Sequence, residues 1–178
     1  MLIILFLTLA ALSNPTDALL EAAAQGDTNK VDVLLQSGVS SNARDQHRLF
    51  TALHNAAAQG HVEICNTLIA SGAAVDAIDR HGATPLVSGA YSGRLDIVDL
   101  LILHHALLDV VPSAAPTALI AAIMSGDKAV VTRLLGAGAN PSLPDFSGQS
   151  PIDAAKSAGL QEIVSLLGVA QSQQSEHQ

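Results

Sequence analysis

Five glycines recur along the chain at a nearly constant spacing. Gly26, Gly60, Gly93, Gly126 and Gly159 are separated by 34, 33, 33 and 33 residues. A period of this length indicates a repeated supersecondary unit, because so short a unit buries its apolar face only against its neighbours. The composition agrees, since 49% of the residues are hydrophobic but only 2% are aromatic. Thin layers of alanine and leucine fit these values, and the repeat therefore predicts a solenoid.

Each unit begins with the signature of a short helix. A side chain that can accept a hydrogen bond from the first helical turn stands at each expected N-cap: Asp17, Thr51, Thr84, Thr117 and Ser150. Pro85 and Pro151 come next, at the first helical position, where a missing N–H has no cost. Small residues form a column five positions after the caps: Ala22, Ala56, Gly89, Ala122 and Ala155. We expect neighbouring first helices to approach closely at this column.

A second helix is predicted after each glycine, from apolar residues at helical spacing such as Ile64, Leu68 and Ile69. A connector follows, and two connectors contain the turn signal D-x-x-G, at Asp79–Gly82 and Asp145–Gly148. The units run over residues 17–50, 51–83, 84–116, 117–149 and 150–168, within one domain of residues 14–168. Each unit is expected to be a helix, a turn, a second helix and a projecting, hairpin-like connector.

This pattern resembles the ankyrin repeat. The resemblance rests on T-A-L-H-N-A-A at Thr51–Ala57, T-P-L at Thr84–Leu86 and G-A-N-P-S-L-P-D-F-S-G-Q-S-P-I at Gly138–Ile152. The period also matches the 33 residues of that family. The resemblance covers Asp17 to about Leu167, and it implies an all-α solenoid of paired antiparallel helices with hairpin-like connecting loops. We interpret the chain as a bacterial-type, exported member with five repeats.

Two connectors depart from the family pattern. The connector before Thr51, N-A-R-D-Q-H-R-L-F-T, has one extra residue and no glycine at its turn. The connector H-H-A-L-L-D-V-V-P-S-A-A-P-T has His105 where a glycine would end the helix, and it lacks D-x-x-G. We expect this connector to be irregular, through drift within a loop or through a specialised role. His104 and His105 are expected to end a helix, where its dipole favours a cation, and not to bind a metal.

The two ends of the chain differ from the repeats. Residues 2–12 form a nearly unbroken apolar run without charge, which is typical of a signal-peptide core and too short to span a bilayer as a helix. We interpret residues 1–13 as a signal peptide, which predicts a periplasmic or secreted protein without a stable membrane span. The alternative is a cytoplasmic protein whose apolar N-terminal helix caps the first repeat. The polar residues 169–178 are predicted to be disordered.

The sequence contains none of the catalytic motifs that we sought. It has no phosphate-binding loop, no H-E-x-x-H and no G-x-S-x-G, so we expect no enzyme activity, no cofactor and no metal site. A small enzyme built on His54, His81 or Cys65 is the alternative, but no constellation supports it. The net charge of −8 argues against binding to nucleic acid. Cys65, the single cysteine, is predicted to be a small core residue.

The predicted function is recognition of another protein. The resemblance implies that the connector tips and the exposed side of the first helices form a concave face that binds partners. To this face we assign Arg44, Gln46, His47, Arg48, Phe50, Asn55, Gln59, Arg80, His81, Tyr91, Ser92, Met124 and Phe146. Outside residues 1–13, every aromatic residue of the chain belongs to this set. Aromatic residues are enriched among interface anchors, although one or more of these could instead shield a loop base.

The charged residues divide between two regions of the sequence. Arg44, Arg48 and Arg80 lie in the first two connectors, whereas many acidic residues lie in or beside the second helices. This division predicts a partner with an acidic or polar surface patch, bound by a monomer; ordinary solvated loop charge is the alternative. We expect a non-enzymatic module that acts as scaffold, inhibitor or companion of an envelope or secreted protein. A cytoplasmic adaptor is the alternative.

Overall fold

The computed structural model describes residues 14–175. These residues form ten α-helices, and no strand is present among them apart from an isolated antiparallel bridge between Arg44 and Thr51. The helices are α2 (Pro15–Gln25), α3 (Thr28–Gln36), α4 (Ala52–Gln59), α5 (Val62–Ala70), α6 (Pro85–Tyr91), α7 (Leu95–Leu103), α8 (Ala118–Ser125), α9 (Lys128–Gly136), α10 (Pro151–Ser157) and α11 (Gln161–Ser175). The predicted all-α fold is confirmed.

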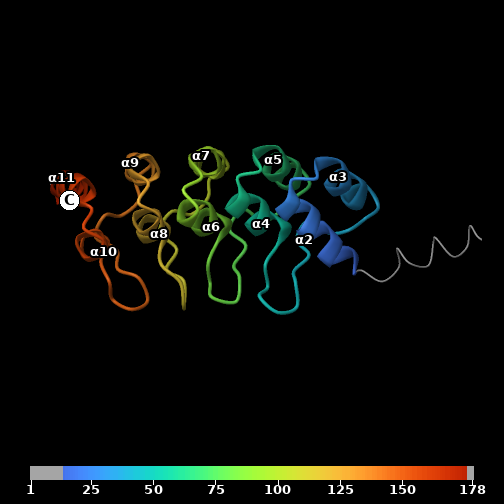
Figure 1. Ribbon diagram of the computed structural model, residues 1–178, viewed down its shortest axis with the longest axis horizontal. Helices are drawn as coiled ribbons and strands as arrows, with labels where there is room; N and C mark the ends of the chain where they lie inside the picture. Colours follow the sequence, from blue (N-terminus) through green and yellow to red (C-terminus); the bar gives the residue numbers. More distant parts are fainter. Residues whose placement is uncertain (1–13, 176–178) are drawn as a thin grey trace, which may run out of the picture.

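The helices form pairs that stack in two rows. Each first helix (α2, α4, α6, α8 and α10) packs against the second helix that follows it and against the first helix of each neighbouring pair. The second helices (α3, α5, α7, α9 and α11) form the other row, and the connectors project from the first helices on the side away from the second helices (Figure 1). We number the connectors one to four: residues 37–51, 71–84, 104–117 and 137–150. The stack is a solenoid, as the period predicts.

Four of the first helices begin directly after the predicted cap residue. The Thr84 side chain accepts a hydrogen bond from the Val87 N–H, and Thr117 and Ser150 act in the same way. The prediction for the first unit is wrong, because α2 begins at Pro15 and not after Asp17. Asn14 is its N-cap, with Oδ1 accepting from the Thr16 N–H at 3.1 Å. An asparagine followed by proline provides both the cap and a suitable first helical residue, three positions earlier than predicted.

The column of small residues lies at the centre of the stack. Its members are buried: Ala22, Ala56, Gly89, Ala122 and Ala155. At Gly89, a Cβ atom would lie 2.9 Å from the Cγ2 atom of Ile97, so the space there admits no larger side chain. Leu19, Leu53 and Leu86 are fully buried beside this column. The first helices pack against one another along the stack, so the close approach that the alanine run predicts is confirmed.

Residues in the left-handed backbone conformation reverse the direction of the chain at the ends of several helices. Gly26, Gly60 and Gly126 are C-caps with φ between 75° and 85°, as predicted for the periodic glycine. In connector three, His105 takes this conformation with φ 60°, and in connector one Leu49 does so with φ 59°. The two connectors that depart from the family pattern therefore keep a left-handed turn but place it on a residue with a side chain, which is less favourable.

The predictions for the two chain ends have different outcomes. The predicted signal peptide, residues 1–13, lies outside the described residues. The prediction of a disordered tail from residue 169 is wrong for residues 169–175, because α11 continues to Ser175. Within this extension, Gln171 Nε2 donates to the Pro141 carbonyl at 3.1 Å, which ties the helix to connector four. In the part of the chain that the structure describes, no helix is long and apolar enough to cross a membrane.

Candidate functional site

Backbone and side-chain hydrogen bonds hold the connectors side by side. The Arg80 N–H donates to the Arg48 carbonyl at 2.8 Å, and Arg44 Nη1 donates to the Ile78 carbonyl at 2.6 Å. Connectors two and three are joined in the same way, because the Ala114 N–H donates to the His81 carbonyl at 3.0 Å. The tips of the first three connectors therefore form one continuous edge, and residues far apart in sequence share it.

A glycine permits the close approach of connectors two and three. Gly82 has φ 79°. A Cβ atom on it would lie 2.9 Å from the backbone nitrogen of Ser113 and 3.1 Å from the Cα of Pro112. Because both atoms belong to the neighbouring backbone, they cannot move aside as a flexible side chain could. The glycine of D-x-x-G thus has two roles: it adopts the left-handed conformation of its own turn, and it allows the neighbouring connector to approach closely.

Asp45 and Asp79 accept hydrogen bonds from backbone N–H groups of their own turns. Asp45 accepts from the N–H groups of Arg48 and Phe50 at 3.0 and 2.6 Å. Asp79 accepts from His81 and Ala83, both at 2.8 Å. Partial burial would raise the pKa of Asp45, but hydrogen bonds from the backbone N–H groups together hold it below its usual value. These acidic groups stabilise the loops, and they point toward backbone N–H groups.

The basic side chains of the first two connectors are exposed. Arg48 and Arg80 are brought together by the hydrogen bond between their backbones, and His47 and His81 are exposed on the same two tips. Arg44 is also exposed, but its guanidinium is engaged by the Ile78 carbonyl. The structure thus brings together the positive charges that the sequence places 32 residues apart at Arg48 and Arg80.

Two residues assigned to the face have clear structural contacts. Phe50 is only partly exposed and stacks on the His54 ring, with centroids 5.6 Å apart, while the Arg48 guanidinium lies 6.0 Å above the Phe50 ring. Asn55 is partly buried, and its Nδ2 donates to the Leu20 carbonyl at 3.0 Å. Phe50 therefore covers the base of connector one, and Asn55 joins α4 to α2.

His54 is buried at the base of connector two. Its Nδ1 accepts from the Thr51 N–H at 3.2 Å, so the hydrogen of the neutral ring is on Nε2, which donates to the Ala83 carbonyl at 3.1 Å. Burial lowers the pKa of His54, and the bond to Ala83 and the nearby Asp79 oppose this effect. The neutral ring links α4 to the next repeat.

Apolar side chains lie exposed along the same face. Tyr91 is 57% exposed, Met124 56% and Phe146 55%. Sequence reasoning missed four further exposed apolar residues of the connectors: Leu49, Ile78, Leu107 and Val111. The signal that could have found them is their position in the loops, where the short helices leave no core to cover them. The polar residues Gln46, Gln59 and Ser92 are exposed as well.

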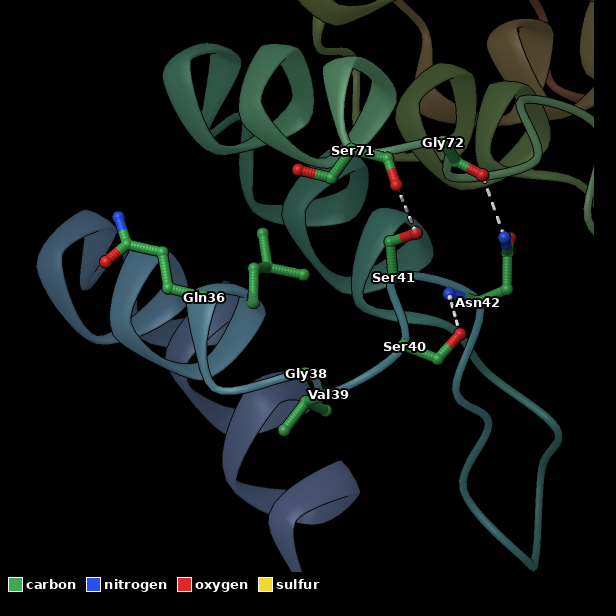
Figure 2. A pocket seen from close by; sticks show the side chains of 9 residues that line it. Gln36, Gly38, Val39, Ser40, Ser41, Asn42, Ser71 and Gly72 are labelled. Carbon is green, nitrogen blue, oxygen red and sulfur yellow. Dashed lines mark hydrogen bonds between the residues drawn. The ribbon is translucent and has the colours of Figure 1, made fainter.

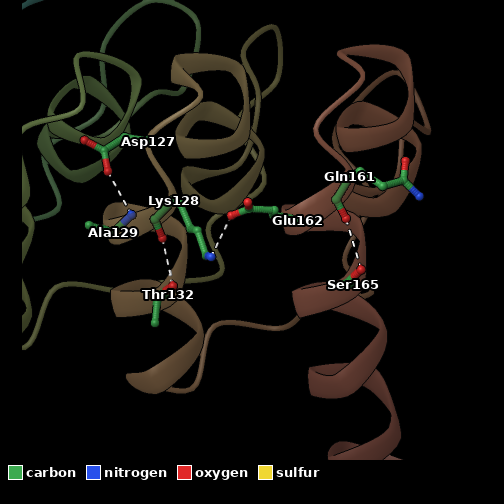
Figure 3. Close-up of polar contacts among 7 residues, drawn as sticks. All are labelled: Asp127, Lys128, Ala129, Thr132, Gln161, Glu162 and Ser165. Carbon is green, nitrogen blue, oxygen red and sulfur yellow. Dashed lines mark hydrogen bonds and ion pairs between the residues drawn. The ribbon is translucent and has the colours of Figure 1, made fainter.

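Ion pairs join neighbouring second helices. Lys128 Nζ and Glu162 Oε2 lie 2.8 Å apart and join α9 to α11 (Figure 3). The hydrogen bond from Lys128 lowers the pKa of Glu162. Arg133 pairs with Asp99 and joins α9 to α7. These ion pairs bridge neighbouring repeats at the surface, where such pairs contribute little stability each.

A depression of about 470 Å³ lies where the first repeat meets the second. Figure 2 shows that its polar groups bind one another: Ser41 Oγ donates to the Ser71 carbonyl at 2.9 Å, and Asn42 Nδ2 donates to the Gly72 carbonyl at 2.8 Å. The Asn42 side-chain oxygen also accepts from the Ala74 N–H. These groups hold two repeats together, and the depression offers few polar groups to a ligand.

The described residues include one cysteine and no group of metal ligands. Cys65 is buried in the core, as predicted, and desolvation raises the pKa of its thiol to about 12. A thiol of this kind does not form the reactive thiolate at neutral pH. Within residues 14–175, no three His, Cys, Asp or Glu side chains are grouped so that they could hold a metal ion.

Family profiles match most of this stack. The profile for ankyrin repeats in three copies matches residues 19–113, and the profile for the single ankyrin repeat matches residues 117–146. The chain belongs to the ankyrin repeat family. A comparison with curated proteins finds no match. The ankyrin repeat family is a non-catalytic interaction fold, so this ankyrin repeat chain is a protein–protein interaction module. The helix pair α10 and α11 lies beyond both matches.

Proposed function

We propose that this ankyrin repeat protein binds its partner through the concave face, defined as the connector tips with the exposed side of the first helices. The observation that carries the proposal is the exposure of Tyr91, Met124 and Phe146, each more than half accessible. Large apolar side chains exposed together on one face are typical of interaction sites. Phe50 and Asn55 act as supports of this face through their contacts with His54 and Leu20.

The partner has an acidic or polar surface patch that faces connectors one and two. The exposed Arg48 and Arg80 support this proposal, because they place two guanidinium groups side by side at this edge of a chain that is acidic overall. Complementary charge accelerates encounter and selects among partners more than it tightens a complex. We further propose that the protein acts as a monomer and without catalysis, as scaffold, inhibitor or companion. The pair α10 and α11 then serves as a fifth, terminal repeat.

Affinity purification with quantitative mass spectrometry tests the choice of face. The wild-type chain is compared with Arg80→Glu and with Lys30→Glu, a matched charge reversal on the exposed surface of α3 in the other row. We expect Arg80→Glu to deplete the partner and Lys30→Glu to retain it. Retention by Arg80→Glu with loss by Lys30→Glu would show that the second helices, and not the concave face, bind the partner.

The proposed location is the periplasm or the exterior, with an envelope or secreted protein as partner. The support is the uncharged apolar run of residues 2–12, whose length suits a signal peptide. A reporter fused after Gln178 should be exported from a Gram-negative host, and deletion of residues 2–12 should retain it in the cytoplasm. Retention of both fusions would favour the alternative, a cytoplasmic adaptor with an apolar N-terminal helix.

A further inference from the structure

The arginines of the connector tips lie at one end of the concave face. Beyond them, the exposed Lys156 lies on the terminal first helix, α10. Arg48 and Arg80 stand on connectors one and two, whereas α6, α8 and connectors three and four contain no lysine or arginine. The carboxylates of Asp45 and Asp79 accept hydrogen bonds from their own turns, so they are directed away from a ligand above the tips. This end of the face therefore offers exposed guanidinium groups to carboxylates.

The opposite end of the face is apolar. Tyr91 and Met124 occupy the same position in successive repeats, 33 residues apart, on the packed helices α6 and α8. Packed helices have axes about 8–10 Å apart, so the two side chains are near neighbours on the surface. Val111 and Phe146, 47% and 55% exposed, extend the apolar area on connectors three and four.

The two ends are separated by one to two repeats. With a helix spacing of about 10 Å, the basic and apolar centres lie about 10–20 Å apart along the stack. An extended chain advances about 3.3 Å per residue, so about three to six residues span this distance. Asp17 and Glu21 are exposed on α2, next to the basic end. Their charge disfavours a shift of an acidic ligand toward the N-terminal repeat.

We propose that the concave face binds a single contiguous segment of its partner that contains two blocks. An acidic block lies over Arg48 and Arg80, and an apolar or aromatic block lies over Tyr91 and Met124, with about three to six residues between them. This inference rests on the proposed use of the concave face. It adds the chemistry, the spacing and the order of the two blocks along the solenoid.

The test uses a library of random 12-residue peptides displayed on phage and four forms of the full chain. The forms are the wild type, Arg48→Glu/Arg80→Glu, Tyr91→Ala/Met124→Ala, and a control, Lys30→Glu/Val33→Ala, altered at exposed positions of α3. Peptides enriched on the wild type should contain an acidic and an apolar block at the stated spacing. The arginine variant should select the apolar block alone, the Tyr91 and Met124 variant the acidic block alone, and the control both.

Kinetics with one selected peptide give a second measurement. Arg48→Glu/Arg80→Glu should lower the association rate about tenfold at low salt and weaken its salt dependence. Tyr91→Ala should raise the dissociation rate about 30-fold, as expected for a buried anchor. Enrichment of peptides with only one block on the wild type would overturn the inference, and so would a failure to enrich any. The affinity purification described above tests the use of the concave face independently of the two-block segment. It would still capture a partner that binds this face through a folded surface.

Discussion

Replacing Gly89 by alanine sets two opposing effects against each other inside α6. An alanine in a helix interior is more favourable than glycine by about 0.8–1.0 kcal/mol. The new Cβ would, however, lie 2.9 Å from Ile97 Cγ2 and 3.6 Å from Ile97 Cβ, and Ile97 is fully buried. Overpacking in a core costs about 1–3 kcal/mol. We therefore expect Gly89→Ala to change the free energy of unfolding by between about zero and a loss of about 2 kcal/mol.

Gly136 provides a matched control for this substitution. It is the last residue of α9, and a Cβ on it would meet nothing within 4 Å. Gly136→Ala should therefore stabilise the protein, by at most about 1 kcal/mol. The difference between the two variants isolates the packing effect, and we expect Gly89→Ala to be less stable by about 1–3 kcal/mol.

Urea unfolding followed by circular dichroism measures this difference. The dependence of the unfolding free energy on urea concentration should be the same for all variants. Ile97→Leu gives an internal test, because leucine carries no methyl group on its Cβ. In a double-mutant cycle, Gly89→Ala should cost less when Ile97 is leucine. Equal stabilisation by Gly89→Ala and Gly136→Ala would refute the close approach of α6 and α7 at this position.

Three further predictions concern other parts of the stack. Ala56→Leu and Ala122→Leu should each destabilise by about 1–3 kcal/mol through overpacking, and unchanged urea midpoints for both would contradict the packing described. The lowered pKa of His54 means that the folded protein binds fewer protons than the unfolded chain just below pH 6.5. Stability should thus fall as the pH falls below 6.5, and His54→Gln should flatten this dependence in melts at pH 5 to 7; an equally steep curve would exclude His54 as its source. Cys65, with a pKa of about 12, should react with a thiol reagent only after denaturation, and rapid labelling of the native protein would contradict its burial.

The period of the glycines determined most of the fold. Thr84, Thr117 and Ser150 were predictable as caps because capping depends on a side chain and the backbone two or three residues away. The burial of Ala56 was predictable because the same small residue type recurs in register. The start of α2 was mispredicted because alignment on Gly26 placed Asp17 at the cap, whereas Asn14 and Pro15 give a stronger local start.

The C-terminal helix shows why composition alone failed at one end. Residues 169–175 are mostly polar, which predicts disorder, yet α11 extends through them. The helix is already nucleated and docked through Ile163 and Leu167, so each added residue needs only propagation and no new nucleus. The Gln171 contact with connector four adds a tertiary restraint that a local pattern cannot reveal.

By itself the sequence determined the repeat, the helix pairs and the set of residues near the concave face, because these depend on periodicity and on local turn chemistry. Only the tertiary structure decided which of those residues are presented. It placed Arg48 beside Arg80, directed Asp45 toward its own turn, and covered Phe50 with Arg48 while leaving Tyr91 exposed. The physical reason is that hydrogen bonds and packing between connectors join residues about 30 positions apart, and these contacts assign each side chain to the loop or to the surface.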